Sequence, residues 1–333
     1  MKEKIWALLV HLSTNNKPPE ETEVNFDDEM WAYILEESVK AGINTIVLDI
    51  GGGIEYGSHP ELATKGAWSR NRVREEVKRC KDLGIALIPK LNFSTTHGLW
   101  LGEYARMVST TKYYQVCNDL IKEAYELFDH PAYIHLGMDE EDAKHHKGRA
   151  YAVYRQKDLL FHDLNFLLDC VADTGARPWI WSCPLFTYPE LYKKYVGAKD
   201  AILSPWYYNA FNKEHWTPVE SRAEYVAYYN EGDYAKLGMK FVEEDPFLVN
   251  FRKVALPLME EGYEYVPCAS VFNRCDWNTH DLFEYFKDNA PEDQVLGFIT
   301  APWCATDGSS ERCKTFYEET FRFFKEAKEK FYG

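Results

Sequence analysis

The stretch IHLGMDEED, residues 134–142, joins an apolar run to four consecutive acids. Its first half alternates as a strand does, and successive side chains of a strand point to opposite faces. Leu136 therefore lies on one face, while His135 and Asp139 share the other. If helices cover the apolar face, the second face looks into the interior of the sheet. Glu140 joins Asp139 there only where the chain turns out of the strand.

Similar short apolar runs recur along the chain and alternate with amphipathic stretches. Eight strands in alternation with about eight helices predict a (β/α)8 TIM barrel, and we expect residues 1–333 to form one such domain. The expected strands are Ile5–Leu12, Thr45–Ile50, Ala86–Asn92, Tyr133–Met138, Trp179–Ser182, Ala201–Tyr207, Tyr265–Phe272 and Val295–Thr300. The expected helices are Asp27–Ala41, Arg70–Leu83, Thr110–Phe128, Ala152–Ala172, 222–230, 248–261, His280–Asp288 and Ser310–Phe331. A doubly wound sheet is the alternative, but the glycines at 51–53 lack the spacing of a nucleotide-binding turn.

The charge balance restricts the partners. The 333 residues carry 38 Lys and Arg against 53 Asp and Glu, a net charge of −15. Such a surface repels nucleic acids and anionic lipid, so we expect neither a nucleic-acid partner nor a membrane partner. A carbohydrate partner agrees with the 10 Trp and 23 Tyr, whose rings suit sugar faces as well as a core.

The N-terminal apolar run and the cysteines bear on the compartment. Ile5–Val10 is too short for a signal-peptide core or a membrane span, so we expect a soluble protein; its native compartment stays open. The eight cysteines show no CxxC spacing, which predicts no metal cluster and no cofactor. Cys268 and Cys275 are the candidates for a disulfide.

The carboxyl ends of the expected strands carry polar and aromatic residues. In a TIM barrel the chemistry sits at these ends, so the residues should converge at one mouth. They are His11, Asp49, Lys90, Asn92, His97, His135, Asp139, Glu140, Trp181, Trp206, Tyr207, Tyr208 and Trp303. Asp139 and Glu140 would be neighbours, as in sites where two carboxyls divide the acid and base roles. Glu141, Asp142 and the pair His145–His146 are expected to face solvent.

Three segments in order resemble the β-N-acetylhexosaminidases of glycoside hydrolase family 20. Residues 135–140, HLGMDE, are similar to the family's strand-four motif H-x-G-G-D-E, with Met138 as the departure. HPELATKGAWS (59–69) resembles its y-P-x-L-t-x-x-G-A segment, and GIALIPKLNFSTTHG (84–98) its g-I-x-v-I-P-E-I-D-x-P-G-H segment. The resemblance covers residues 40–142 well and the rest loosely.

The resemblance implies retaining hydrolysis assisted by the substrate, in which the acetamido oxygen of the sugar attacks its own anomeric carbon. It implies that Asp139 orients the acetamido group and that Glu140 is the general acid and base. His97 would help to set the proton affinity of Glu140, and the side chains of Trp181 and Trp303 would pack against the sugar. Tyr207 or Tyr208 is the candidate for the tyrosine that binds the acetamido oxygen in the family.

Several positions depart from the family pattern. The Glu and Asp of I-P-E-I-D fall at Lys90 and Asn92, and the strand-two histidine position holds Asp49. The family's arginine after strand one has no counterpart in HLSTNN (11–16), where His11 stands, and its glutamate after the strand-eight tryptophan is replaced at Cys304 and Ala305. The acid pair is present while the residues that read sugar hydroxyls differ, so the sequence leaves the sugar and the linkage open.

Two other functions stay open. The first is a carbohydrate-binding barrel with vestigial catalysis, in which Lys90 pairs with Glu140 and holds it ionised. The second is a metal-dependent sugar isomerase that uses Asp49, His97, Asp139, Glu140 and His280, since these residue types ligate hard divalent ions. The oligomeric state is not predicted by any pattern in the sequence.

Overall fold

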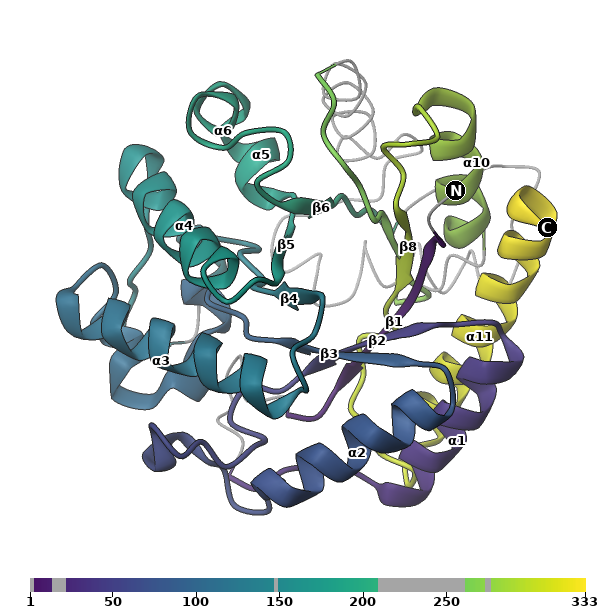
Figure 1. The fold of residues 1–333 in the computed structure, drawn as a ribbon, viewed down its shortest axis with the longest axis horizontal. Coiled ribbons are helices and arrows are strands. Elements are labelled where there is room, and N and C mark those ends of the chain that lie inside the picture. Colours follow the sequence, from purple (N-terminus) through teal and green to yellow (C-terminus); the bar gives the residue numbers. More distant parts are fainter. Residues whose placement is uncertain (1–2, 14–21, 147–148, 209–260, 273–276) are drawn as a thin grey trace, which may run out of the picture.

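Eight parallel strands form one sheet at the centre of the molecule, and helices lie around it (Figure 1). The structure, a computed structural model, describes residues 3–13, 22–146, 149–208, 261–272 and 277–333. The strands follow the order β6-β5-β4-β3-β2-β1-β8-β7, and single bridges Leu203↔Tyr265 and Trp206↔Cys268 join the two outer strands. The predicted (β/α)8 barrel is therefore confirmed. The strands are β1 (Ile5–His11), β2 (Thr45–Asp49), β3 (Ala86–Lys90), β4 (Tyr133–His135), β5 (Arg177–Trp181), β6 (Ile202–Ser204), β7 (Cys268–Ala269) and β8 (Gly297–Thr300).

Helices surround the strands on the outside (Figure 1). Several of them start at a side-chain cap, which satisfies backbone N–H groups that the first turn leaves without a partner. Asp27 caps α1, Ser69 caps α2, Thr110 caps α3 and Ser310 caps α11. The helices are α1 (Asp28–Lys40), α2 (Arg70–Asp82), α3 (Thr111–Leu127), α4 (Lys157–Ala172), α5 (Cys183–Thr187), α6 (Pro189–Tyr195), α10 (Asn278–Asn289) and α11 (Glu311–Tyr332).

Strand parity divides the core into two layers. Outward side chains such as Leu8 and Leu48 pack against the helices, and inward ones such as Ala7 and Val47 fill the barrel. In β1 to β6 the last inward position carries a polar or aromatic group, because the pattern switches there from apolar to polar. The register pairs His11 with Asp49, Asp49 with Lys90, and Lys90 with His135. These four residues therefore form one layer at the carboxyl end of the barrel.

Some elements differ from the sequence-based prediction. The fourth strand ends at His135 rather than Met138, because Gly137 and Met138 both have a φ of 71° and leave the extended conformation. The fourth helix begins at Lys157 rather than Ala152. The short helices α5 and α6 were not predicted. The expected helix 222–230 lies outside the described residues, as does nearly all of 248–261.

Candidate active site

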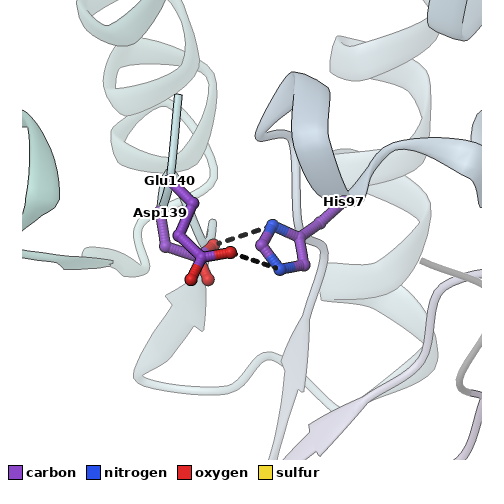
Figure 2. Close-up of side chains that lie close together, drawn as sticks. All are labelled: His97, Asp139 and Glu140. Atoms are coloured by element: carbon purple, nitrogen blue, oxygen red, sulfur yellow. Dashed lines mark ion pairs between the residues drawn. The ribbon is translucent and has the colours of Figure 1, made fainter. Parts of the chain in front are cut away.

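A left-handed turn after β4 brings the two acids to the same side. Gly137, Met138 and Glu140 all have positive φ values, of 71°, 71° and 53°. A Cβ on Gly137 would lie 2.0 Å from Asn92 Oδ1, so only glycine fits at this position. The Met138 side chain is buried with Leu136 in the outer core, as parity predicts. Because the chain turns here, Asp139 and Glu140 extend in the same direction although they are adjacent in sequence (Figure 2).

His97 lies against both carboxyl groups (Figure 2). It ends the short 3₁₀ helix η2 (Thr95–His97), which follows β3. Its Nδ1 is 3.5 Å from Asp139 Oδ1, and its Nε2 is 3.6 Å from Glu140 Oε2. Thr96 Oγ1 lies 3.0 Å from the same His97 Nδ1. The structure thus brings together the three residues that the sequence predicts as catalytic.

Asn92 holds Asp139 through both ends of its amide. Its Nδ2 donates to Asp139 Oδ1 at 2.9 Å, while its Oδ1 accepts from the backbone N–H groups of Met138 at 3.3 Å and Ser94 at 3.1 Å. A carboxylate has no hydrogen to donate, so an aspartate could make only the second set of bonds. The Ser94 hydroxyl also donates to the Asp139 carbonyl. The asparagine at this position therefore has a defined role in orienting Asp139.

Glu141 is buried, which corrects the prediction that it faces solvent. Its side chain is 4% exposed and accepts from the Thr95 N–H and hydroxyl, both at 2.9 Å. Arg155, 1% exposed, places Nε 2.8 Å from Glu141 Oε1, contacts Asp163 at 3.3 Å and donates to the Phe93 carbonyl at 2.7 Å. Arg155 lies in the irregular segment just before α4, which begins at Lys157.

His145 and His146 do not form the expected solvated loop. They belong to the 3₁₀ turn η4 (Lys144–His146), where His146 is buried. His145 Nε2 lies 3.4 Å from Glu140 Oε1, and its Nδ1 lies 2.8 Å from Asp142 Oδ1. Sequence reasoning missed His145 as a neighbour of the acid pair; its spacing from Glu140 within a polar segment was the only signal.

Lys90 pairs with Asp49 and not with Glu140. Its Nζ donates to Asp49 Oδ2 at 2.6 Å, and His11 Nδ1 lies 3.0 Å from the same oxygen. Lys90 is 2% exposed, and Asp49 and His11 are also buried, so all three side chains lie inside the barrel. Burial opposes ionisation of Asp49, but the charge of Lys90, together with His11, holds the pKa of Asp49 below its usual range. The pairing expected for a vestigial site, Lys90 with Glu140, is therefore wrong.

His135 completes this layer as a neutral side chain. Burial, with the nearby Lys90 charge, lowers the pKa of His135 well below its ordinary value. Its Nδ1 accepts from the Gly137 N–H at 3.0 Å, so the proton of the neutral ring sits on Nε2. Among the described residues this Nε2 has no hydrogen-bond partner, and neither has the buried Trp181 Nε1. The two rings are 4.6 Å apart. They offer two buried donors to a ligand oxygen.

Aromatic rings gather at the carboxyl ends of β5, β6 and β8. Trp303 lies 5.7 Å from Trp181 and 6.2 Å from Tyr208, measured between ring centroids, and Trp206 stacks on Tyr208 at 5.1 Å. His11 is 5.8 Å from Trp303, which connects these rings to the buried Asp49 group.

Tyr207 is separate from this group. Its hydroxyl donates to Asp281 at the start of α10, and it packs in the outer core. Of the two candidate tyrosines, Tyr208 alone joins the aromatic rings at the mouth.

A metal ion would find one set of suitable groups in the described part of the chain. His97, Asp139 and Glu140 each offer a ligand atom within 4.8 Å of the others. The other two residues of the isomerase hypothesis lie elsewhere: Asp49 is paired with Lys90, and His280 stacks on Trp277 at 4.5 Å. An imidazole that contacts two carboxylates is equally what an acid–base group requires. Cys268 is a free thiol, and Cys275 lies outside the described residues.

Comparisons with known proteins identify the fold. No family model and no curated protein sequence matches this chain, and no described helix is long and apolar enough to cross a bilayer. Solved structures do match. The β-N-acetylhexosaminidase of Bacteroides fragilis is 12% identical with a TM-score of 0.59, covering 96% of this chain and 66% of that one.

Two further structures agree. The family 20 β-N-acetylhexosaminidase of Streptomyces coelicolor is 13% identical with a TM-score of 0.60, covering 97% of this chain and 64% of that one. Dispersin B is 12% identical with a TM-score of 0.56, covering 99% of this chain and 100% of that one. This chain thus spans just under two thirds of the first two proteins and all of Dispersin B. At these identities the likeness is one of fold, and the fold is that of the solved β-N-acetylhexosaminidases of glycoside hydrolase family 20.

Proposed function

We propose that this protein is a glycoside hydrolase that cleaves β-N-acetylhexosaminides from a chain end by a retaining, substrate-assisted mechanism. The observation that carries the proposal is the turn after β4, where Asp139 and Glu140 lie side by side with His97 3.5 and 3.6 Å from their carboxyl oxygens. The fold shared with solved β-N-acetylhexosaminidases supports the same reaction class.

The two acids have different surroundings, which suits different roles. Asp139 accepts the Asn92 amide and is fixed by it, as expected of a carboxylate that orients the acetamido group and stabilises its developing charge. Glu140 has histidines near both of its oxygens, as expected of a group that gains and loses a proton. Glu140 would protonate the leaving oxygen in the first step and accept a proton from water in the second.

The remaining mouth residues would bind the sugar. Trp181, Trp303, Trp206 and Tyr208 supply aromatic faces, and the buried N–H groups of His135 and Trp181 supply donors. Hydroxyl recognition would fall to His11 and to the Asp49–Lys90 pair, in place of the arginine and acids of the family pattern. This exchange supports a sugar that differs from N-acetylglucosamine in its ring hydroxyls or their substituents.

A panel of nitrophenyl β-glycosides tests the proposal. Each sugar is offered with and without the 2-acetamido group, and release of nitrophenol is measured. We expect turnover only of the acetamido sugars, because the mechanism takes its nucleophile from that group. Equal turnover of the matching sugars without it would contradict substrate assistance. Hydrolysis of no glycoside, with sugar binding detected by calorimetry, would favour the binding barrel instead.

A further inference from the structure

Each carboxyl oxygen of Glu140 faces a different imidazole. His97 Nε2 lies 3.6 Å from Oε2, and His145 Nε2 lies 3.4 Å from Oε1. The two histidines come from different segments, η2 after β3 and η4 after β4. The family resemblance implies one histidine against the acid, at His97, and His145 is a second imidazole that contacts Glu140.

Asp142 fixes the orientation of His145. Its Oδ1 accepts from the His145 backbone N–H at 3.1 Å and lies 2.8 Å from the ring Nδ1. Because a carboxylate only accepts, the Nδ1 carries a hydrogen. The neutral ring then presents the lone pair of Nε2 toward Glu140 Oε1. A proton placed between His145 Nε2 and Glu140 Oε1 can therefore bind to either atom.

We propose that His145, oriented by Asp142, shares a proton with Glu140 and holds it available for the acid step. The inference rests on the proposed function. In one form the proton is on Nε2 of an imidazolium beside a Glu140 carboxylate; in the other it is on Glu140 beside a neutral ring. Transfer from Nε2 to Oε1 creates the glutamic acid, and that acid donates its proton to the departing oxygen. The attacking water returns one proton to the Glu140–His145 pair.

Other titratable groups also lie close to Glu140 and His145, and an experiment must distinguish their effects from that of His145. Asp139 and His97 approach Glu140 from the turn and from η2. Cys183, at the start of α5, lies against the Glu140 backbone, and burial raises the pKa of its thiol, so it stays neutral. Asp142 and Glu140 are the acids in contact with His145. His145 is thus a partner of Glu140 that can be replaced without removing a contact to Asp139 that the described residues show.

The pH dependence of kcat/KM distinguishes proton sharing by His145 from a purely structural role, because a structural role would leave the alkaline limb in place. The alkaline limb of kcat/KM reports loss of the proton used in the acid step. A proton shared between a carboxylate and an imidazole persists to higher pH than one held by the carboxyl alone. Removing His145 should therefore shift the alkaline limb to lower pH. A histidine that acted only as a positive charge would give a shift in the opposite direction.

The kinetic test compares His145→Gln with wild type on an aryl β-N-acetylhexosaminide. We expect the alkaline limb to move down by about one pH unit, with Asp142→Asn giving a smaller shift in the same direction. The matched control is His130→Gln, since His130 pairs with Glu126 at 3.1 Å on the exposed surface of the molecule. An unmoved limb, or one moved to higher pH, would overturn the proposal.

A second measurement decides the question without turnover. NMR of the ring nitrogens follows His145 titration in the wild type and in Glu140→Gln. We expect the midpoint of the His145 titration to fall when the carboxylate is removed, and the His130 midpoint to stay unchanged. Identical His145 curves would overturn the proposal. If the wild type hydrolyses no glycoside, the proposed function fails while this NMR comparison still tests proton sharing.

Discussion

Arg155 and Glu141 form a buried ion pair next to the turn that follows β4, with Arg155 Nε 2.8 Å from Glu141 Oε1. Glu141 is also bonded to Thr95, and the Arg149 guanidinium donates to the carbonyls of Thr95 and Thr96. The segment that carries His97 and the turn that carries Asp139 and Glu140 are thus fastened to the same buried group. The spacing of the proposed acid and its histidine depends on this pair.

We expect Glu141→Gln to destabilise the protein strongly. The change leaves the buried Arg155 charge with Asp163 as its remaining acidic partner, and breaking a buried pair costs about 3–5 kcal/mol. The free energy of unfolding in urea measures this. The control is Glu36→Gln, which removes an exposed pair with Lys40 and should change stability by less than about 1 kcal/mol. Equal effects of the two substitutions would contradict a structural role for Glu141.

Stability should decline in two stages as the pH falls. The pKa of His135 is lowered by burial, so below about pH 6.5 the unfolded chain binds a proton that the folded chain does not. The pKa values of Asp49 and Glu141 are lowered by their cationic partners against the effect of burial, so their contribution is present above about pH 4 and is lost beneath it.

Urea unfolding across this pH range tests both stages. In His135→Asn the side-chain oxygen can still accept from Gly137, so the first decline should be reduced while the second remains. A wild-type stability that is constant from about pH 6.5 to 5 would contradict the assignment of a neutral, buried His135.

Gly137 should be sensitive to a single added carbon. In Gly137→Ala the new Cβ would meet Asn92 Oδ1 at 2.0 Å, in addition to the cost of a positive φ. Gly84→Ala is the matched control, because Gly84 has a φ of 75° and no atom within 4 Å of the added carbon. The control should lose about 1–2 kcal/mol from backbone strain alone, and Gly137→Ala should lose clearly more stability and most of the activity. Equal losses would mean that Asn92 moves away freely.

Asn92→Asp tests why this chain has an amide where the family pattern has an acid. The substitution removes the N–H that donates to Asp139 and places a second carboxylate beside it. We expect kcat/KM to fall by at least about tenfold, with a much smaller change in stability. Activity equal to or above that of the wild type would show that Asp139 needs no donor from residue 92.

The barrel and much of its mouth could be predicted from sequence because both depend on local patterns. The alternation of apolar residues in β1 gives its inward face, and the same parity gives the positions of His135 and Met138. The positions of Asp49, Lys90 and His135 in one layer follow from strand register, which the barrel imposes.

The residues that sequence reasoning missed depend on contacts across irregular segments. Glu141 and Asp142 are adjacent acids, yet one is buried by Arg155 and the other binds His145. No periodicity marks Arg155, which lies in the irregular segment before α4. Burial of its charge can be predicted only when its acidic partner is known. The expected pair of Lys90 with Glu140 was wrong for a similar reason. Lys90 binds Asp49 on the neighbouring strand β2, and only the strand register brings these two residues together.

The role of Glu140 as the general acid is tested by hydrolysis of an aryl β-N-acetylhexosaminide by wild type, Glu140→Gln and the surface control Glu126→Gln. We expect Glu140→Gln to lose at least about 100-fold in kcat/KM, the share of a general acid, while product binding measured by calorimetry persists. Glu126→Gln should match the wild type, since Glu126 is an exposed residue of α3. Full activity in Glu140→Gln would show that Glu140 is not the general acid.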